Sequence, residues 1–173
     1  MDIQYLDSKD FLPSNVFNGI SNDGCYSKII DMEGSGISDG RYIFYLSEGP
    51  IVKNIISYIK RHLENSFSVN LELSSEQLPT LRILDKGHKG IHIHTDFSKN
   101  DKYQEIIAIL YCNTINSGYF EFWLDNGEFF ESGYKAQPIE NRLIAFKSTL
   151  QSLHSVSPVY EKRISLNFTF RIK

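Results

Sequence analysis

The most regular pattern of hydrophobic and polar residues lies at the end of the chain, over residues 163–172. Apolar residues occupy every second position, and the positions between them are polar or charged. A period of two is typical of a β-strand that turns one face toward a core and the other toward a different environment. The apolar face comprises Ile164, Leu166, Phe168, Phe170 and Ile172, and the polar face comprises Arg163, Ser165, Asn167, Thr169 and Arg171.

A second alternating segment runs from Ile91 to Phe97 and carries His92, His94 and Asp96 on one face. We expect this segment to be a strand, with His94 and Asp96 projecting from the same side. Most of the chain from Leu81 onward has the character of short strands joined by turns. The further strands and the hairpin turn predicted there are Glu105–Asn113, the turn Leu124–Gly127, Asn141–Phe146 and Leu150–Val156.

One amphipathic helix is predicted before these strands. The segment Ser47–Pro50 resembles a helix start, and apolar residues follow at helical spacing as far as Leu63. A strand at Arg41–Leu46 precedes this helix, and the alternation over Phe67–Leu73 predicts an edge strand after it. Residues 1–40 show no comparable pattern, and we expect them to be irregular. The sequence therefore predicts a mainly β protein, a jelly roll with a supporting N-terminal helix.

Length and composition indicate a single domain over residues 1–173. The net charge of −3 argues against a general nucleic-acid binder, which would carry clustered basic residues. The first residues lack the basic and apolar regions of a signal peptide, and no apolar run is long enough for a membrane span. We therefore expect a cytoplasmic protein without membrane association. Cys112 ends an apolar strand, where it is expected to act as a small buried hydrophobic residue.

The candidate chemistry lies in His94, Asp96, the distant His154, and Arg163 nine residues further on. Two imidazoles and one carboxylate on one side of a metal leave the opposite side open. This is the ligand set of non-haem Fe(II) oxygenases. His94 and Asp96 would come from one strand, and the distant His154 would supply the third ligand.

The order of these residues resembles the motif of the Fe(II)- and 2-oxoglutarate-dependent oxygenase superfamily, and in particular its prolyl-hydroxylase-like branch. The resemblance covers Leu81 to Ile172 and includes Gly90 and the segment Gly118–Phe122. Ser117 stands where that segment of the family has a glycine, and Leu84 stands where many prolyl hydroxylases have a tyrosine. The resemblance implies a double-stranded β-helix, which the alternation alone does not distinguish from another jelly roll. Residues 81–173 would form its catalytic core and residues 1–80 a supporting part.

The resemblance also implies roles for individual residues. His94, Asp96 and His154 would hold Fe(II), and 2-oxoglutarate and O₂ would take the remaining coordination positions. Arg163 would bind the far carboxylate of 2-oxoglutarate, because its planar fork matches a carboxylate with two hydrogen bonds. Tyr111 and Ser165 would assist it. The enzyme would hydroxylate a C–H bond and release succinate and CO₂, since family halogenases replace the carboxylate that Asp96 retains here.

Two other readings of the pattern stay open. A cupin-like metalloprotein would use His92 with His94, because cupin metal sites also begin with two alternating histidines. A jelly roll without catalytic activity would bind neither iron nor 2-oxoglutarate. In the leading interpretation His92, Asn167 and Thr169 line the substrate pocket. The substrate would be a proline-like amino acid, a peptidyl residue or a small metabolite, and the loops Ser98–Lys102 and Glu131–Pro138 carry no motif that selects among them. Nothing in the sequence indicates an oligomeric state.

Overall fold

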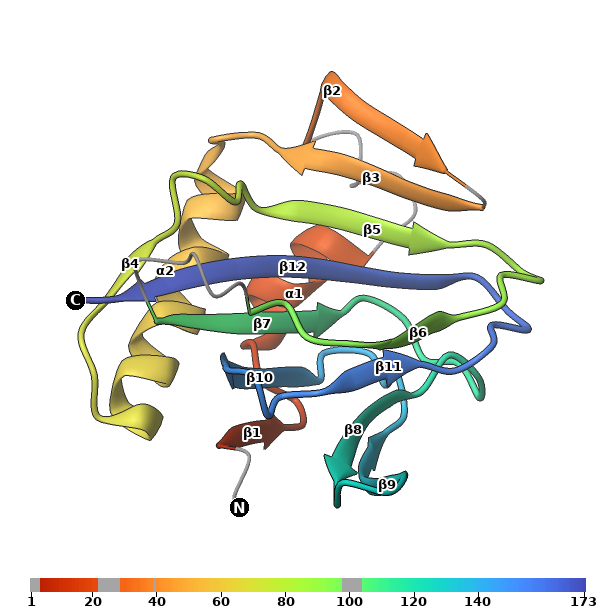
Figure 1. Ribbon diagram of the computed structural model, residues 1–173. Helices are drawn as coiled ribbons and strands as arrows, with labels where there is room; N and C mark the ends of the chain where they lie inside the picture. The colour runs from red at the N-terminus through yellow and green to blue at the C-terminus, as the bar shows by residue number, and fades with distance from the viewer. Residues whose placement is uncertain (1–3, 22–28, 39, 98–103) are drawn as a thin grey trace.

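The computed structural model describes residues 4–21, 29–38, 40–97 and 104–173. Two antiparallel sheets face each other within this part of the chain (Figure 1). The large sheet contains, in spatial order, β1 (Tyr5–Ser8), β10 (Leu143–Ser148), β7 (Glu105–Tyr111), β12 (Arg163–Ile172), β5 (Thr80–Leu84), β3 (Arg41–Leu46) and β2 (Ile30–Ser38), with β4 (Leu71–Leu73) pairing with β12. The small sheet contains β6 (Ile91–His94), β11 (His154–Val156), β8 (Phe120–Asp125) and β9 (Phe130–Ala136).

Two helices, α1 (Ser14–Ser21) and α2 (Pro50–Phe67), pack on one face of the large sheet (Figure 1). Pro50 begins α2, where its fixed φ suits a helix and its missing N–H leaves no hydrogen bond unmade. The buried residues of α2 form one stripe, Val52, Ile55, Ile59 and Leu63. This stripe joins the apolar face of β12 in the main core, so the predicted helix and the alternation of the last strand are both confirmed.

The opposite face of the large sheet turns toward the small sheet. A second core fills part of the space between the sheets, with Ile107, Ile109 and Tyr111 of β7 packed against Phe120 and Phe122 of β8. Cys112 follows β7 and is 2% exposed, as predicted for a small buried hydrophobic residue. The predicted mainly β jelly roll with a supporting N-terminal helix is confirmed. No helix in the described ranges is long and apolar enough to span a membrane.

The expectation of irregular structure over residues 1–40 was wrong, because β1, α1 and β2 lie there. Four residues of β1 pair with β10, and α1 packs against α2, so these short elements depend on partners far away in the sequence. Some predicted strands are also shorter than expected. The helix continues to Phe67, leaving β4 with three residues, and β11 begins only at His154. The predicted polar loop Ser98–Lys102 lies outside the described residues.

Candidate active site

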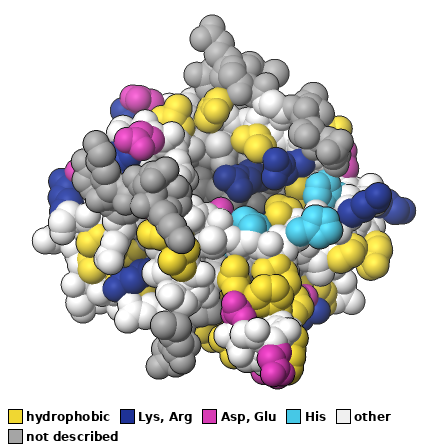
Figure 2. All heavy atoms as spheres, viewed as in Figure 1, with side chains coloured by type: hydrophobic (Ala, Val, Ile, Leu, Met, Phe, Trp, Pro, Cys, Tyr) yellow, Lys and Arg dark blue, Asp and Glu magenta, His cyan; other side chains and the backbone are white. Residues whose placement is uncertain are grey.

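A cavity lies between the two sheets, where the second core leaves space. Strands β3, β5, β7 and β12 line it from the large sheet, and β6, β8 and β11 line it from the small sheet. Its volume is about 90 Å³, so it can hold more than one water molecule or part of a small ligand. Figure 2 shows a hollow on this face of the molecule, with His side chains and a group of Lys and Arg side chains beside it. The polar faces of several predicted strands therefore meet in one pocket.

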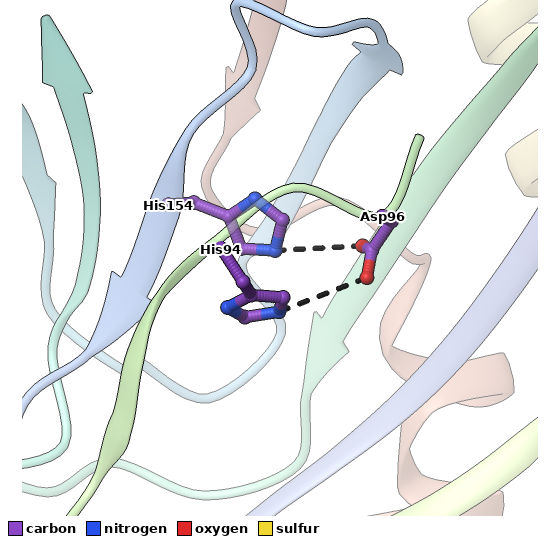
Figure 3. Close-up of side chains that lie close together, drawn as sticks. All are labelled: His94, Asp96 and His154. Atoms are coloured by element: carbon purple, nitrogen blue, oxygen red, sulfur yellow. Dashed lines mark ion pairs between the residues drawn. The ribbon is translucent and has the colours of Figure 1, made fainter. Parts of the chain in front are cut away.

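Three potential metal ligands converge at this cavity (Figure 3). His94 Nε2 lies 3.7 Å from Asp96 Oδ1, and His154 Nε2 lies 3.4 Å from Asp96 Oδ2. One ligand atom from each of the three residues falls within 4.8 Å of the other two. His94 is the last residue of β6 and His154 the first of β11, and these two residues are opposite each other in the strand pairing. Strand pairing therefore brings together ligands that are 60 residues apart in the sequence.

The expectation that His94 and Asp96 share one strand was wrong in one detail, since β6 ends at His94. The chain bends at Thr95, whose hydroxyl donates to the carbonyl of Thr149 and accepts a hydrogen bond from the N–H of Phe97. This bend, rather than the alternation of a strand, turns the Asp96 carboxylate toward the two imidazoles.

Backbone carbonyl groups fix the orientation of both imidazole rings. His94 Nδ1 lies 2.8 Å from the carbonyl oxygen of His92, and His154 Nδ1 lies 2.8 Å from that of Ser152. A carbonyl oxygen only accepts hydrogen bonds, so the proton of each neutral ring is on Nδ1 and the lone pair is on Nε2. Both lone pairs face the Asp96 carboxylate. Partners of this kind orient the histidine ligands of metal sites.

Burial and nearby charges act in opposite directions on Asp96. Burial alone would raise the pKa of its carboxyl group. The hydrogen bond and charge of His154 oppose this, together with the charges of His94 and Arg82, and the pKa lies below its usual value. Asp96 is therefore a carboxylate at neutral pH. Two imidazole lone pairs and one carboxylate repel one another unless a cation lies among them, so this donor set fits a divalent metal such as Fe(II).

Arg163 lies at the start of β12, facing the cavity, and is 5% exposed. Its Nη2 donates to the hydroxyl of Tyr111 at 3.2 Å, and its guanidinium carbon lies 4.9 Å from the centre of the Tyr111 ring. Its buried Nε has no hydrogen-bond partner among the described residues. A buried donor without a partner is costly, and a ligand carboxylate would satisfy it. The arrangement therefore fits an anionic ligand such as 2-oxoglutarate.

The other predicted site residues lie at varied distances from this centre. Ser165 is fully buried and its hydroxyl donates to Oδ1 of Asn167. Asn167 and Thr169 line the cavity, and Thr169 donates to Gln77. His92 is exposed and lines a separate outer depression beside Arg41 and His88. Within the described residues the metal-type cluster contains His94 but not His92, so the geometry lends no support to a cupin-like pair.

Arg41 and Arg82 also line the cavity, although neither was predicted from the sequence as a site residue. A local signal for Arg82 was present, because it lies between the apolar residues Leu81 and Ile83 in a strand. Alternation places such a residue on the face opposite to its neighbours. Arg41 starts β3, and its approach to the site depends on the pairing of β3 with β5.

Solved structures of similar fold include several prolyl hydroxylases. A prolyl-4-hydroxylase from Pseudomonas putida is 18% identical, with a TM-score of 0.73 over 99% of this chain and 94% of the other. A prolyl hydroxylase from Trichoplax adhaerens, in complex with a hypoxia inducible factor peptide fragment, is 15% identical, with a TM-score of 0.68 over 97% and 83%. A viral collagen prolyl hydroxylase from Paramecium Bursaria Chlorella virus-1 is 14% identical, with a TM-score of 0.67 over 96% and 88%. These likenesses confirm the predicted double-stranded β-helix.

No curated protein is similar enough in sequence to count as a relative. The sequence profile of the 2OG-Fe(II) oxygenase superfamily matches residues 80–171, which is more than half of the chain. The match coincides with the segment Leu81–Ile172 that carries the motif, and it confirms the predicted enzyme class. Enzymes of this superfamily use Fe(II), 2-oxoglutarate and O₂, which agrees with the donor set in the cavity. The chain belongs to the 2OG-Fe(II) oxygenase superfamily.

Proposed function

We propose that His94, Asp96 and His154 bind Fe(II) and that Arg163 binds the far carboxylate of 2-oxoglutarate, in an enzyme that hydroxylates a C–H bond. The converging lone pairs of the two imidazoles and the Asp96 carboxylate are the observation that carries this proposal. Protonation of both rings at Nδ1 leaves Nε2 ready to coordinate a metal. Fe(II) in such a site, with 2-oxoglutarate and O₂ bound, supplies the oxidation and yields succinate and CO₂.

The residues of the chain hold the reactants in place. The guanidinium of Arg163 offers two parallel donors to a carboxylate, and Tyr111 holds this guanidinium from one side. Ser165 is the residue next to Arg163 on the same face of β12, and its hydroxyl can turn from Asn167 toward the same carboxylate. The ring of His154 is packed by Phe120 and Phe146, which keep water from that side of the metal position.

The substrate we propose is an amino acid, a peptidyl residue of proline type or a small metabolite. The similarity of the fold to prolyl hydroxylases supports a proline-like group, and His92, Asn167 and Thr169 would line its path. We further propose that residues 1–173 act as one cytoplasmic domain, in which residues 1–80 support a catalytic core of residues 81–173. Arg41 of the supporting part reaches the cavity, which favours one cooperative unit.

The test is an anaerobic titration of the protein with Fe(II) and then 2-oxoglutarate, followed by the weak visible charge-transfer band typical of this family. We expect one equivalent of each to bind in the wild type, and the band to be lost in His154→Ala. Arg163→Lys should raise the Kd for 2-oxoglutarate by about tenfold or more, because lysine lacks the two-pronged donor geometry.

His92→Ala is the matched control, since it removes a nearby imidazole outside the cluster. It should leave metal binding unchanged. Metal affinity that depends on His92 and survives Asp96→Ala would refute the proposed ligand set in favour of a cupin-like site. A protein that binds neither Fe(II) nor 2-oxoglutarate would be a jelly roll without this activity.

A further inference from the structure

Arg82 is a charged residue in the middle of a strand of the large sheet. Its neighbours Leu81 and Ile83 pack into the core beneath the helices, so its own side chain faces the cavity. Its Nε donates to Thr80 Oγ1 at 3.3 Å. Its terminal nitrogens have no hydrogen bond or ion pair with any described residue. The guanidinium of Arg82 can therefore offer donors to a ligand in the cavity that the metal ligands also line.

Buried arginines elsewhere in this protein have carboxylate partners. Arg142 binds Asp7 through Nε and Nη2. Arg171, on the same face of β12 as Arg163, lies 2.8 Å from Glu76 and 3.8 Å from Glu105. In the described part of the chain, neither Arg82 nor Arg41 lies within ion-pair distance of a carboxylate. Among the described residues, Arg142 and Arg171 are thus neutralised by carboxylates, whereas the arginines of the cavity have no carboxylate within ion-pair distance.

Positive side chains outnumber negative ones in the lining of the cavity. Its charged lining consists of Arg41, Arg82 and Arg163 against the single carboxylate of Asp96. Under the proposed function, Fe(II) and the doubly charged 2-oxoglutarate cancel each other, and Arg163 and Asp96 do the same. The guanidinium groups of Arg41 and Arg82 are then the uncompensated charges. An excess of positive charge in a pocket partly shielded from bulk water is unfavourable, so a bound anion would be attracted there.

The electrostatics of Arg82 agree with this imbalance. Burial lowers the pKa of its guanidinium, and the charge of Asp96 opposes that effect. The charges of Arg41 and Arg163 lower the pKa further, because like charges disfavour the protonated form. The charge of Arg82 is therefore felt by both Asp96 and Arg163, as expected for residues that line one cavity.

We infer that the substrate is a small molecule with a free carboxylate, which Arg82 binds with assistance from Arg41. This inference rests on the proposed function and narrows its substrate class. Because Arg82 lines the same small cavity as the metal ligands, we expect the carboxylate to be only a few bonds from the carbon that is oxidised. A free amino acid meets this requirement. A proline-type residue inside a peptide does not, since its only carboxyl group is part of an amide and carries no charge.

The experiment uses the protein loaded with Zn(II) in place of Fe(II) and with 2-oxoglutarate, so that binding is measured without turnover. The probes are the common L-amino acids, including L-proline, and the corresponding amino-acid amides, which differ only in the charge of the carboxyl group. Kd values are measured by ligand-observed NMR. The variants are Arg82→Gln, Arg82→Lys as the conservative replacement, and Arg61→Gln as the matched control, because Arg61 is exposed on α2.

We expect at least one amino acid to bind about tenfold or more tightly than its amide, as a charge-assisted pair of hydrogen bonds predicts. Arg82→Gln should abolish this preference, Arg82→Lys should restore part of it, and Arg61→Gln should retain it. The affinity for 2-oxoglutarate should stay within about twofold of wild type in Arg82→Gln, since Arg163 provides that contact.

Two results would overturn the inference and leave the proposed function intact. In the first, 2-oxoglutarate binds in an Arg163-dependent manner, but no amino acid binds better than its amide. In the second, Arg82→Gln weakens 2-oxoglutarate binding as strongly as Arg163→Lys, which would make Arg82 a cosubstrate ligand. A wild-type protein that binds neither Zn(II) nor 2-oxoglutarate would refute the proposed function, and the inference with it.

Discussion

Gly90 immediately precedes β6, and its backbone packs closely against the end of β11. Replacing Gly90 by alanine tests how rigidly these two strands, which carry His94 and His154, are positioned. Its φ is +88°, a region that residues with a side chain rarely adopt. A Cβ at this position would lie 2.2 Å from the carbonyl oxygen of Val156 and 2.8 Å from the carbonyl carbon of Ser157. Both contacts involve backbone atoms, which cannot rotate away. The strands themselves would have to separate.

Gly87 is the matched control, because its φ of +91° is almost the same but nothing lies within 4 Å of its added Cβ. Gly87→Ala should lose about 1 kcal/mol of unfolding free energy from the backbone conformation alone. Gly90→Ala should lose that amount and about 2 kcal/mol more for the overlap. At about 2–4 °C per kcal/mol in a protein of this size, Tm should fall by about 3 °C and about 9 °C respectively.

The assay is thermal unfolding of both variants by circular dichroism, with Fe(II) affinity measured anaerobically in parallel. Gly90→Ala should also weaken metal binding, since His94 is on β6 and its partner His154 is on β11. Gly87→Ala should not. Equal Tm values for the two variants would refute the reasoning, because they would mean that the strands separate without resistance.

Three further predictions follow from the site and its surroundings. Gly118→Ala would place a Cβ 2.9 Å from Cδ of Arg163, so it should raise the Kd for 2-oxoglutarate and leave the Kd for Fe(II) unchanged in titrations. Burial raises the pKa of Asp7, but hydrogen bonds from Arg142 and Tyr134 and the charge of Arg142 hold it below its usual value overall. The stability from this depressed pKa is present above pH 4 and is lost as pH falls through the folded value. Asp7→Asn should therefore flatten the acid limb of the Tm–pH curve and cost about 3 kcal/mol at pH 7, where the Arg142 charge is left unpaired. Arg82→Gln should raise the Tm of the ligand-free protein by about 2–4 °C, because it removes an uncompensated cation, and a fall in Tm would reveal a structural partner.

The sequence alone determined those features that repeat over short distances. The alternation from Arg163 to Ile172 identified both faces of β12, since each residue's orientation depends only on its position in the strand. The start of α2 and its apolar stripe were equally local. A metal site was also indicated before any distance was known. Few side chains bind iron, and His94, Asp96 and His154 follow one another in the order that is typical of such sites.

Tertiary structure alone decided which segments meet. Residues 1–40 gave no strong local pattern, yet β1 and β2 form there because their hydrogen-bond partners are provided by β10 and β3. The turn of Asp96 toward the imidazoles depends on the hydrogen bond from Thr95 to Thr149, two residues that are 54 positions apart. Whether an arginine has a carboxylate partner likewise depends on distant strands, so Arg82 and Arg171 look alike in the sequence and differ in the fold. Side-chain alternation is a property of neighbouring residues, whereas pairing and charge compensation arise only when distant parts of the chain come into contact.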